Sequence, residues 1–242
     1  MTTPGRPLDG QVAIVTGAGR GIGRAVACAL AAEGASVVLA ARTRAELAAA
    51  AEEIHAAGRV ALAIPADVRE ERDVVALVDE TLGRLDRVNV LVNAAGTASF
   101  GPVVDAKTDE WDAMLAVNLR GAMLATRAVL RPMLRQQRGT IISIASIAAR
   151  RPIANCAAYA ATKAGLVAFS RTVAEEVRPW VRVGVVLPGA VDSPLWDALG
   201  SGPDRSRMLS VHDVARAVVL MATLPSNAAL EDVELMPAAG IL

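Results

Sequence analysis

Residues 11–23 read QVAIVTGAGRGIG, and this stretch decides how the rest of the chain is interpreted. Residues 11–16 form a short, mostly apolar run that is rich in β-branched side chains, which is typical of a buried strand. The glycines that follow lead into residues 24–33, whose pattern predicts a helix that ends near Gly34. A strand, a glycine-rich turn and a helix in this order form the start of a βαβ unit.

The same alternation of short apolar runs and longer amphipathic runs continues to the end of the chain. It predicts further strands at 36–41, 60–64, 88–92, 140–145, 181–187 and 232–236, and helices at 44–57, 70–85, 109–117, 119–136, 159–177 and 211–224. Strands that alternate with helices imply a parallel sheet covered on both faces. We therefore expect one α/β domain over residues 1–242, with a flexible tail at residues 1–8.

Composition excludes several classes of protein. The chain has 242 residues, of which 53% are hydrophobic, and its formal net charge is zero. A globular core is therefore expected, and nucleic acid is not an expected partner. No apolar run reaches the roughly 18 residues of a membrane span, and no secretory signal is visible. Two cysteines, Cys28 and Cys156, are too few for a disulfide framework, and no metal-ligand spacing is present, so we expect a cytoplasmic protein without a metal.

The glycine stretch indicates a phosphate site. A turn between a strand and a helix directs backbone N–H groups and the helix N-terminus at one point, and glycines let a diphosphate approach closely. The spacing here is Gly17-x-x-x-Gly21-x-Gly23, which differs from the common G-x-G-x-x-G pattern. The alternative is a tight turn with no ligand.

One pair of residues indicates acid–base chemistry. Tyr159 is the single tyrosine, and it precedes Lys163, one of only two lysines, by four residues. Positions i and i+4 share a helix face, so the ammonium is expected to stabilise the phenolate. A phenol with an ordinary pKa of about 10 needs a drop of about three units, or about 4 kcal/mol, to work near neutrality. One charge at 4 Å and an effective dielectric constant of 20 supplies about 4 kcal/mol.

The chain resembles the short-chain dehydrogenase/reductase family almost end to end, and in particular its 3-oxoacyl-ACP-reductase-like members. The motifs that carry the resemblance are TGAGRGIG at 16–23, NAAG at 93–96, Asn118 in VNLRG, Ser146, YAATK at 159–163 and Pro188-Gly189. The resemblance implies a Rossmann fold, doubly wound, with a seven-stranded parallel sheet. Two positions depart from the family pattern: Ala94 replaces an asparagine, which predicts a less rigid turn, and Ser193 replaces a threonine.

The resemblance also implies residue roles. Tyr159 would be the general acid/base, Ser146 would bind the substrate oxygen, Lys163 would hold the nicotinamide ribose, and Asn118 would hold a water. Ser143 is the alternative to Ser146, and Asn118 can instead mark a break between two helices. The expected cofactor-binding residues are Gly17, Gly19, Arg20, Gly21, Ile22, Gly23, Arg42, Asp67, Val68, Asn93, Ala94, Ala95, Gly96, Tyr159, Lys163, Pro188, Gly189, Val191 and Ser193.

Two arginines favour NADP(H) over NAD(H). NAD sites usually place an acid about 20 residues past the glycines, whereas here the second strand ends at Ala41 and is followed by Arg42. Arg42 and Arg20 can bind a 2′-phosphate, and the alternative is two solvated surface arginines. Asp67 can contact the adenine or cap the helix that follows it.

The substrate side is less defined by the sequence. Ile147, Asn155, Cys156, Ala190 and Trp196 are expected to line the pocket, with residues 194–210 as a lid. His55 and His212 are expected at the surface. The helices at 119–136 and 159–177 match those that pair across twofold axes in the family, which predicts a homotetramer or homodimer, and the apolar end Gly240-Ile241-Leu242 fits a tail placed against a neighbouring subunit.

Taken together, the sequence predicts an NADP(H)-dependent oxidoreductase, such as a ketoreductase, that transfers a hydride between the nicotinamide and a carbonyl or secondary alcohol. An NAD(H)-dependent secondary-alcohol dehydrogenase of the same family is one alternative. A cofactor-sensing binding protein without catalysis is another. An epimerase or dehydratase would need a larger C-terminal substrate domain than this sequence carries.

Overall fold

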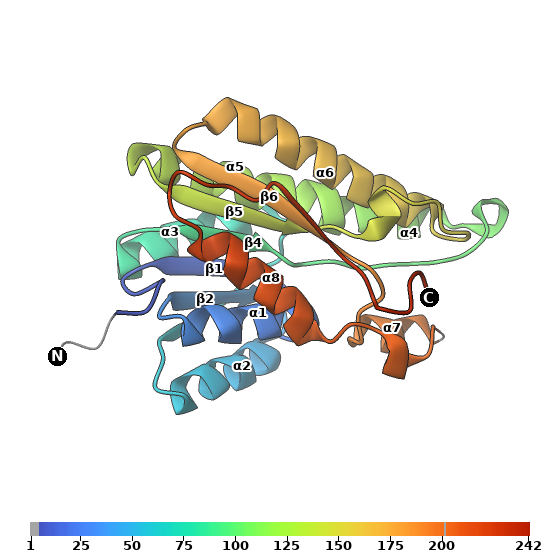
Figure 1. The fold of residues 1–242 in the computed structure, drawn as a ribbon, viewed down its shortest axis with the longest axis horizontal. Coiled ribbons are helices and arrows are strands. Elements are labelled where there is room, and N and C mark those ends of the chain that lie inside the picture. The colour runs from blue at the N-terminus through green and yellow to red at the C-terminus, as the bar shows by residue number, and fades with distance from the viewer. Residues whose placement is uncertain (1–4, 201) are drawn as a thin grey trace.

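The computed structural model describes residues 5–200 and 202–242, and in them all seven strands join one parallel sheet (Figure 1). The strand order is β3-β2-β1-β4-β5-β6-β7, so the chain runs outward from β1 in one direction and then outward from β4 in the other. The strands are β1 (Val12–Thr16), β2 (Ser36–Ala41), β3 (Ala61–Pro65), β4 (Val90–Asn93), β5 (Gly139–Ile144), β6 (Val181–Pro188) and β7 (Asp232–Leu235). The predicted doubly wound sheet is confirmed.

Helices cover both faces of the sheet, and the central strands β1, β4 and β5 are buried along their whole length. One core packs the sheet against α1 (Gly21–Ala32), α2 (Arg44–Ala56) and α8 (Val211–Thr223). The other core packs it against α3 (Glu71–Leu85), α5 (Ala122–Arg135) and α6 (Ala157–Val177). Every residue of β1 is buried, as expected for a central strand of a parallel sheet. Pro65 is accommodated because β3 is an edge strand.

One stretch of helix differs from the sequence prediction. Two helices were predicted at 109–117 and 119–136, with Asn118 as a possible break between them. The structure instead has one continuous helix, in which α4 (Thr108–Met114) passes through a π-helical segment (Leu115–Gly121) into α5. The wider π turn absorbs the irregularity that the sequence pattern shows, and such turns are frequent at functional sites.

This continuous helix is long and apolar enough, by length and composition alone, to cross a membrane. Its most apolar window has a mean hydropathy of 1.3, and 44% of that window is buried inside the molecule. The buried face of this helix packs on the sheet and against α3 and α6. We therefore interpret the helix as part of the layer that covers the sheet.

The start of the chain is partly described. Residues 1–4 of the predicted flexible tail lie outside the described residues. Leu8, at the end of that stretch, is fully buried, and its N–H donates to the Glu33 carbonyl at 3.0 Å. The loop before β1 is therefore anchored to the end of α1.

Candidate active site

The glycine stretch forms a bare backbone turn at the carboxyl end of β1. The helix α1 begins at Gly21, three residues earlier than the pattern predicted, so its N-terminus lies inside the turn. Gly17 has a φ of +67°, and a Cβ there would lie 2.8 Å from the Ala95 backbone. A Cβ at Gly23 would lie 2.2 Å from the Gly17 carbonyl oxygen. The turn therefore needs glycine for packing, and it presents free N–H groups to a ligand at a helix N-terminus.

The close approach at Gly23 gives a stability prediction. We expect Gly23→Ala to lower the free energy of unfolding by about 2–3 kcal/mol, because the methyl group has no space against backbone atoms. Gly83 is the matched control, because it also lies in a helix and a Cβ there meets nothing within 4 Å. Gly83→Ala should raise the stability by up to about 1 kcal/mol. Urea denaturation of both variants tests this, and equal effects would contradict it.

A cleft of about 550 Å³ opens at the carboxyl ends of the strands. All the predicted cofactor-binding residues except Asn93 line it, and so do Ser146, Ile147, Cys156, Ala190 and Trp196. Three predicted site residues do not line the cleft, and they are Asn93, Asn118 and Asn155. Further lining residues that the sequence reasoning missed include Thr43, Glu46, Phe100, Ile153, Ile241 and Leu242.

Asn93 is not among the residues that line the cleft, and its predicted contact with the cofactor stays a prediction. Its side chain is 4% exposed, and its Nδ2 donates to Thr126 Oγ1 at 3.2 Å and to Ser143 Oγ at 3.4 Å. It points into the helix layer because it is the last residue of a central strand. Ser143, the alternative to Ser146, is buried in the same cluster, where it also accepts from Ser170.

The turn after Asn93 is held by a hydroxyl on the neighbouring strand. The N–H groups of Ala94 and Ala95 both donate to Thr16 Oγ1, at 3.2 and 3.3 Å. We expected a looser turn because Ala94 lacks an amide side chain. The hydroxyl at the end of β1 ties the turn to the sheet, and the lower rigidity relative to a turn with asparagine stays a prediction.

Asn118 is buried in the π-helical segment and joins two other elements. Its Oδ1 accepts from the Thr97 N–H at 2.8 Å, and its Nδ2 donates to the Thr97 carbonyl at 2.9 Å and to Thr162 Oγ1 at 3.1 Å. Thr162 in turn donates to the Tyr159 carbonyl. The side chain therefore fixes the loop after β4 against the first turns of α6. A Cβ at Gly96 would lie 3.6 Å from Asn118 Oδ1 and 3.7 Å from Lys163 Nζ, which places Gly96 between them.

Asn155 is displaced from the cleft by the backbone. It has a φ of +65°, and its carbonyl accepts a hydrogen bond from the Gly101 N–H at 2.8 Å. This contact ties the loop before α6 to the loop after β4. Asn155 is not among the residues that line the cleft, whereas the adjacent Cys156 is, and a substrate contact for Asn155 stays a prediction.

Tyr159, Ser146 and Lys163 meet at the centre of the cleft. The Ser146 hydroxyl lies close enough to the Tyr159 hydroxyl to lower the pKa of Tyr159, and its oxygen accepts from the Ala148 N–H at 3.2 Å. Lys163 Nζ lies 5.7 Å from the centre of the Tyr159 ring and donates to the Ile144 carbonyl at 2.9 Å. The end of β5, the turn after it and α6 thus bring these three side chains together.

The pKa of Tyr159 moves in the direction opposite to the prediction. Burial raises it to about 12, and the hydrogen bond from Ser146 offsets only part of that rise. Burial also lowers the pKa of Lys163 to about 8. The expected lowering by Lys163 fails here because desolvation disfavours both charged forms, and because the ammonium is directed at the Ile144 carbonyl. The phenol is therefore a proton donor at neutral pH.

The buried Lys163 predicts a dependence of stability on pH. An unfolded lysine keeps its proton up to about pH 10.5, whereas the folded one releases it near its pKa of about 8. The unfolded state binds more protons between these values, so stability should rise with pH there. We expect the free energy of unfolding of the wild type, relative to Lys163→Met, to rise by about 1–3 kcal/mol from pH 8 to pH 10.

The other lysine of the chain provides the control for this measurement. Lys107 is exposed, so Lys107→Met should show no such dependence on pH. Denaturation in urea, without nucleotide and at four pH values, gives the comparison. A difference between wild type and Lys163→Met that stays constant over this range would contradict the prediction.

The end of the cleft beside β2 and β3 carries opposite charges. Arg42 is exposed directly after β2, and Arg20 lies on the glycine turn, 62% exposed. Glu46, which the sequence reasoning did not assign to the site, also lines the cleft, 4.0 Å from Arg20. A Cβ at Gly19 would lie 2.9 Å from Glu46 Oε2, so the carboxylate lies over the turn.

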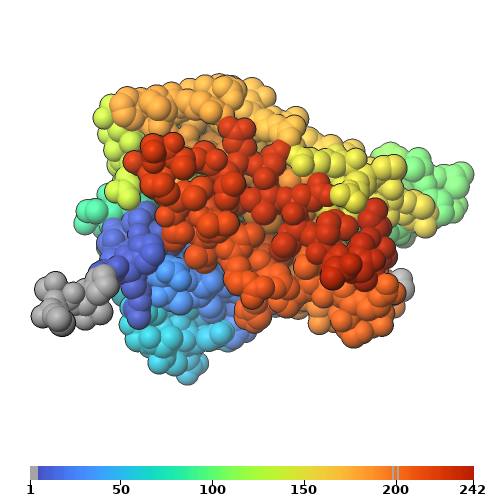
Figure 2. Space-filling view, in the orientation of Figure 1, coloured from blue at the N-terminus to red at the C-terminus, as the bar shows by residue number. Residues whose placement is uncertain are grey.

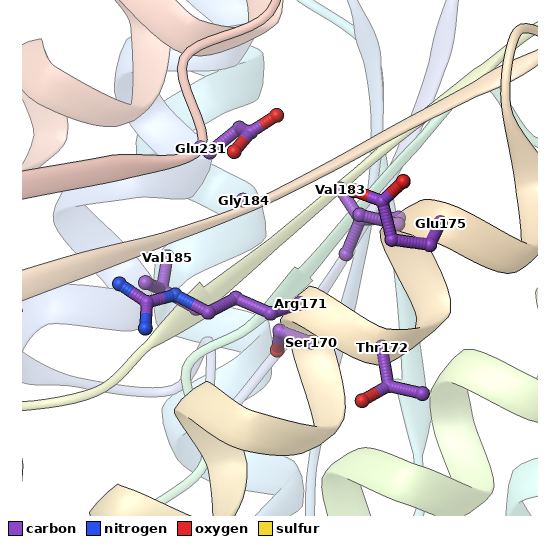
Figure 3. A pocket seen from close by; sticks show the side chains of 9 residues that line it. Ser170, Arg171, Thr172, Glu175, Val183, Gly184, Val185 and Glu231 are labelled. Carbon is purple, nitrogen blue, oxygen red and sulfur yellow. The ribbon is translucent and has the colours of Figure 1, made fainter.

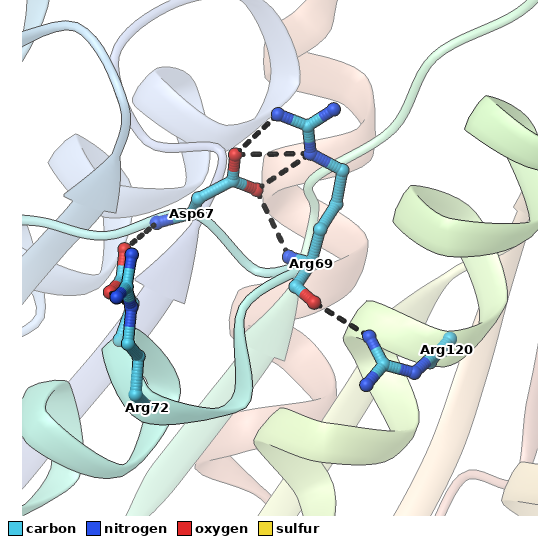
Figure 4. Close-up of polar contacts among 5 residues, drawn as sticks. Asp67, Arg69, Arg72 and Arg120 are labelled. Atoms are coloured by element: carbon cyan, nitrogen blue, oxygen red, sulfur yellow. Dashed lines mark hydrogen bonds and ion pairs between the residues drawn. The ribbon is translucent and has the colours of Figure 1, made fainter.

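Asp67 is held in place by an arginine (Figure 4). Its carboxylate accepts from the Arg69 N–H at 3.0 Å and from Arg69 Nη2 at 2.6 Å, and these bonds lower the pKa of Asp67. The Arg69 carbonyl accepts from Arg120 at 2.6 Å. The first residue before α3 is Glu70, so Asp67 is not the helix cap that was the alternative reading. It lines the cleft instead.

The end of the cleft beside β6 is apolar. Phe100, from the loop after β4, lies edge-on to Tyr159 with ring centres 5.5 Å apart. Trp196, in α7 (Leu195–Leu199), lies 6.0 Å from Phe100. Ile241 and Leu242 line the same cleft, and Figures 1 and 2 show the C-terminal residues beside the segment that holds α7. Within one chain, the tail therefore lies against its own cleft rather than only against a neighbour.

A second cavity, of about 390 Å³, lies away from these groups (Figure 3). It is lined by the middle of α6 and of β6 and by Glu231, whereas the cleft lies at the carboxyl ends of the strands. Arg171, at its edge, bonds Asp232. In the described residues, no group of three or more His, Cys, Asp or Glu is placed to hold a metal ion. His55 and His212 are both exposed.

The donor groups of the cleft fit a nicotinamide dinucleotide. The turn at residues 17–23 suits a diphosphate, since a Cβ at Gly17 or Gly23 would collide with backbone, and Tyr159 and Lys163 line the same cleft. The sheet order places the cleft above the point where the chain reverses direction between β1 and β4. Ligands of open α/β sheets bind at such points.

Comparisons with known proteins agree with this geometry. Residues 11–204 match the family model of the short chain dehydrogenases. A 3-oxoacyl-[acyl-carrier-protein] reductase of Synechocystis sp. is 38% identical over 228 residues, which cover 91% of this chain and 92% of that protein. An uncharacterized oxidoreductase of Staphylococcus aureus is 33% identical over 234 residues, covering 95% and 98% of the two chains.

Two solved structures share the fold over nearly their whole length. A metagenomic short-chain oxidoreductase in complex with NADP has a TM-score of 0.85 and 39% identity, covering 96% of this chain and 99% of that one. An alcohol dehydrogenase from the archaeon Thermococcus sibiricus, complexed with 5-hydroxy-NADP, has a TM-score of 0.88 and 30% identity, covering 94% and 97%.

Proposed function

The chain belongs to the short-chain dehydrogenase/reductase family of nicotinamide-dependent oxidoreductases, and from that premise we propose that it transfers a hydride between NADP(H) and a carbonyl or secondary alcohol, with Tyr159 as general acid/base. The observation that carries the proposal is that Ser146, Tyr159 and Lys163 line the same cleft as the glycine turn. Ser146 lies beside the Tyr159 hydroxyl, and Lys163 Nζ lies 5.7 Å from the centre of the Tyr159 ring.

The proton chemistry follows from the pKa of Tyr159. At about 12, this pKa keeps the phenol protonated at neutral pH, so Tyr159 can donate its proton to a carbonyl oxygen as that oxygen gains charge. The Ser146 hydroxyl, fixed by the Ala148 N–H, is placed to donate a hydrogen bond to the same oxygen. The bound nicotinamide supplies or accepts the hydride. In the oxidation direction, Tyr159 would take the alcohol proton as a phenolate, a form that burial of the side chain disfavours.

Arg20 and Arg42 support the preference for NADP(H) in this proposal. Both line the cleft at the end where a 2′-phosphate would lie, and a guanidinium binds phosphate through several donors. Glu46 favours the alternative, an NAD(H)-dependent dehydrogenase, because a carboxylate can accept from a ribose 2′-hydroxyl and repels a 2′-phosphate. Titration of the protein with NADPH and NADH decides between them. A lower dissociation constant for NADH would overturn the preference.

A cofactor-sensing binding protein is the alternative from another class. It needs the nucleotide site but not the proton-donating centre, so the arrangement of Ser146, Tyr159 and Lys163 favours the enzyme. Consumption of NADPH in the presence of a panel of ketones tests this. Tight NADPH binding without turnover of any ketone, and without oxidation of any secondary alcohol by NADP, would favour the binding protein.

We also propose that the enzyme acts as a cytoplasmic homotetramer or homodimer, with residues 194–210 as a lid; of these residues, Ser201 lies outside the described part. Apolar side chains on the α4–α5 helix support the assembly, since Leu115, Met123 and Leu134 are 39–44% exposed. Light scattering during gel filtration measures the oligomeric state, and a monomer at micromolar concentration would contradict the assembly.

A further inference from the structure

The aromatic residues of this chain are few, and half of them meet at one place. The chain has three tryptophans, two phenylalanines and one tyrosine. Phe100, Tyr159 and Trp196 come from three separate segments and form a contiguous cluster, with ring centres 5.5 Å and 6.0 Å apart. This cluster includes the proton-donating hydroxyl. Aromatic rings in such a cluster offer edges and faces for a further ring or apolar group.

The Trp196 ring of this cluster is held by contacts within the protein, and these contacts also satisfy its polar atom. The Trp196 Nε1 donates to the Val191 carbonyl at 2.9 Å, so the polar atom of that ring is bound within the protein. Packing also fixes the ring, because a Cβ at Gly202 would lie 2.6 Å from it. Apolar side chains complete this end of the cleft, and they are Ile147, Ile153, Cys156, Leu195, Ile241 and Leu242.

Charged side chains are kept to the opposite end of the cleft. The cleft is lined there, beside β2 and β3, by Arg20, Arg42, Glu46 and Asp67. In the sheet, β2 and β3 are separated from β6 by β1, β4 and β5. Lys163 lies at the centre and is 5% exposed, with its amine bonded to the Ile144 carbonyl. A carboxylate on the substrate would therefore lose water among apolar groups without gaining a cation.

Several arginines that follow cleft-lining segments in the sequence already bind carboxylates. Arg205 bonds Asp192 at 3.2 Å and also bonds Asp197, the neighbour of Trp196. Arg150 and Arg151, which follow the lining residue Ala148, bond Asp232 and Glu234 of β7. An acidic carrier domain or an acidic substrate tail would have to compete with these internal acids for the same guanidinium groups.

We propose that the enzyme acts on small, uncharged ketones or secondary alcohols with an aryl or comparably bulky apolar group beside the reacting carbon, and that Phe100 determines this specificity together with Trp196. The proposal rests on the proposed function, since it describes the substrate of that same reaction. In the ternary complex, the apolar group lies against Phe100 and Trp196, and this contact directs the carbonyl oxygen toward Ser146 and Tyr159.

Four ketones separate the effect of charge from that of the ring. They are methyl 4-oxo-4-phenylbutanoate, its free carboxylate, methyl 4-oxopentanoate and 4-oxopentanoate, each assayed with the holoenzyme and the preferred cofactor. We expect each ester to exceed its acid in kcat/KM by about 10- to 100-fold. Methyl 4-oxo-4-phenylbutanoate, which is a phenyl ketone, should exceed the methyl ketone methyl 4-oxopentanoate in kcat/KM by about 10-fold.

Variants with matched controls connect this preference to the named residues. Phe100→Leu and Trp196→Leu should each reduce the preference for the phenyl ketone over the methyl ketone, taken as the ratio of their kcat/KM values, by about 3- to 10-fold, through KM more than kcat. Phe169→Leu and Trp180→Leu replace the same residue types outside the cleft and should leave the preference unchanged. Binding of NADPH, measured by its fluorescence, should be the same in all four variants and shows that each is folded.

The outcomes distinguish the two levels of the argument. If the protein reduces none of the four ketones with either cofactor, and oxidises none of the matching alcohols, the proposed function itself fails. Two results would leave the enzyme activity intact and show that the substrate class is wrong. One is reduction of the two acids as efficiently as of their esters. The other is a higher kcat/KM for acetoacetyl-coenzyme A than for methyl 4-oxo-4-phenylbutanoate. A phenyl preference that survives Phe100→Leu and Trp196→Leu unchanged would overturn the assignment of those residues.

Discussion

Tyr159→Phe should lower kcat by about 10³-fold, within the 10²- to 10⁴-fold range of general acid–base catalysis, and leave NADPH binding within about 2-fold of wild type. The loss corresponds to about 4 kcal/mol of transition-state stabilisation. Only the hydroxyl is removed, and the ring keeps its edge contact with Phe100. Single-turnover kinetics with saturating NADPH, together with an NADPH titration, measure both quantities.

Two serines provide the control for this prediction. Ser146 lines the cleft beside the Tyr159 hydroxyl, whereas Ser143 is buried beneath it, bonded to Asn93 and Ser170. Ser146→Ala should lower kcat by about 10²-fold or more, and Ser143→Ala should change it little. Turnover of Tyr159→Phe at the wild-type rate would show that another group donates the proton. A large effect at Ser143 alone would move the active centre away from the cleft.

Arg42→Ala should raise the dissociation constant of NADPH by about 10- to 100-fold and leave that of NADH nearly unchanged, because hydrogen bonds to charged groups contribute about 1.5–3 kcal/mol each. The guanidinium is exposed at the end of β2, so the effect should shrink as ionic strength rises. Fluorescence titrations with both cofactors at two salt concentrations test the prediction.

Arg44→Ala is the matched control, since Arg44 is exposed two residues away and begins α2 outside the cleft lining. Glu46→Gln should act in the opposite direction and tighten NADPH binding, because it removes the negative charge 4.0 Å from Arg20. Equal losses for NADPH and NADH in Arg42→Ala would mean that this arginine contacts a part shared by both cofactors.

Much of the fold was predictable because strands and helices alternate with distinct periods. β2 was predicted to the residue, and most other boundaries lie within two residues of the prediction. The start of α1 was missed by three residues because glycine is a poor helix former, although here it begins the helix. The π-helical segment was missed because an extra residue in one turn does not change the amino-acid composition of the helix. The extra residue shifts the apolar periodicity, so that one helix looked like two in the sequence.

The site was less predictable than the fold, for reasons that differ among residues. Asn93 and Asn155 have the right type and sequence position, but the direction of a side chain depends on strand register and on backbone conformation. Phe100 lies in a loop without periodicity, so only the contact with Tyr159 reveals it. The pKa of Tyr159 was misjudged because the calculation included a nearby charge and omitted burial, which only a structure provides.

The position of Ile241 and Leu242 in the cleft wall affects how the protein should be produced. An affinity tag or fluorescent protein fused after Leu242 would emerge beside Trp196, where it can obstruct the entrance or supply groups of its own. The first residues, by contrast, precede Leu8, which is anchored to the end of α1 just before β1 begins, whereas the cleft lies at the carboxyl ends of the strands. Kinetic work therefore calls for an N-terminal tag, and a C-terminal fusion would report partly on the fusion partner.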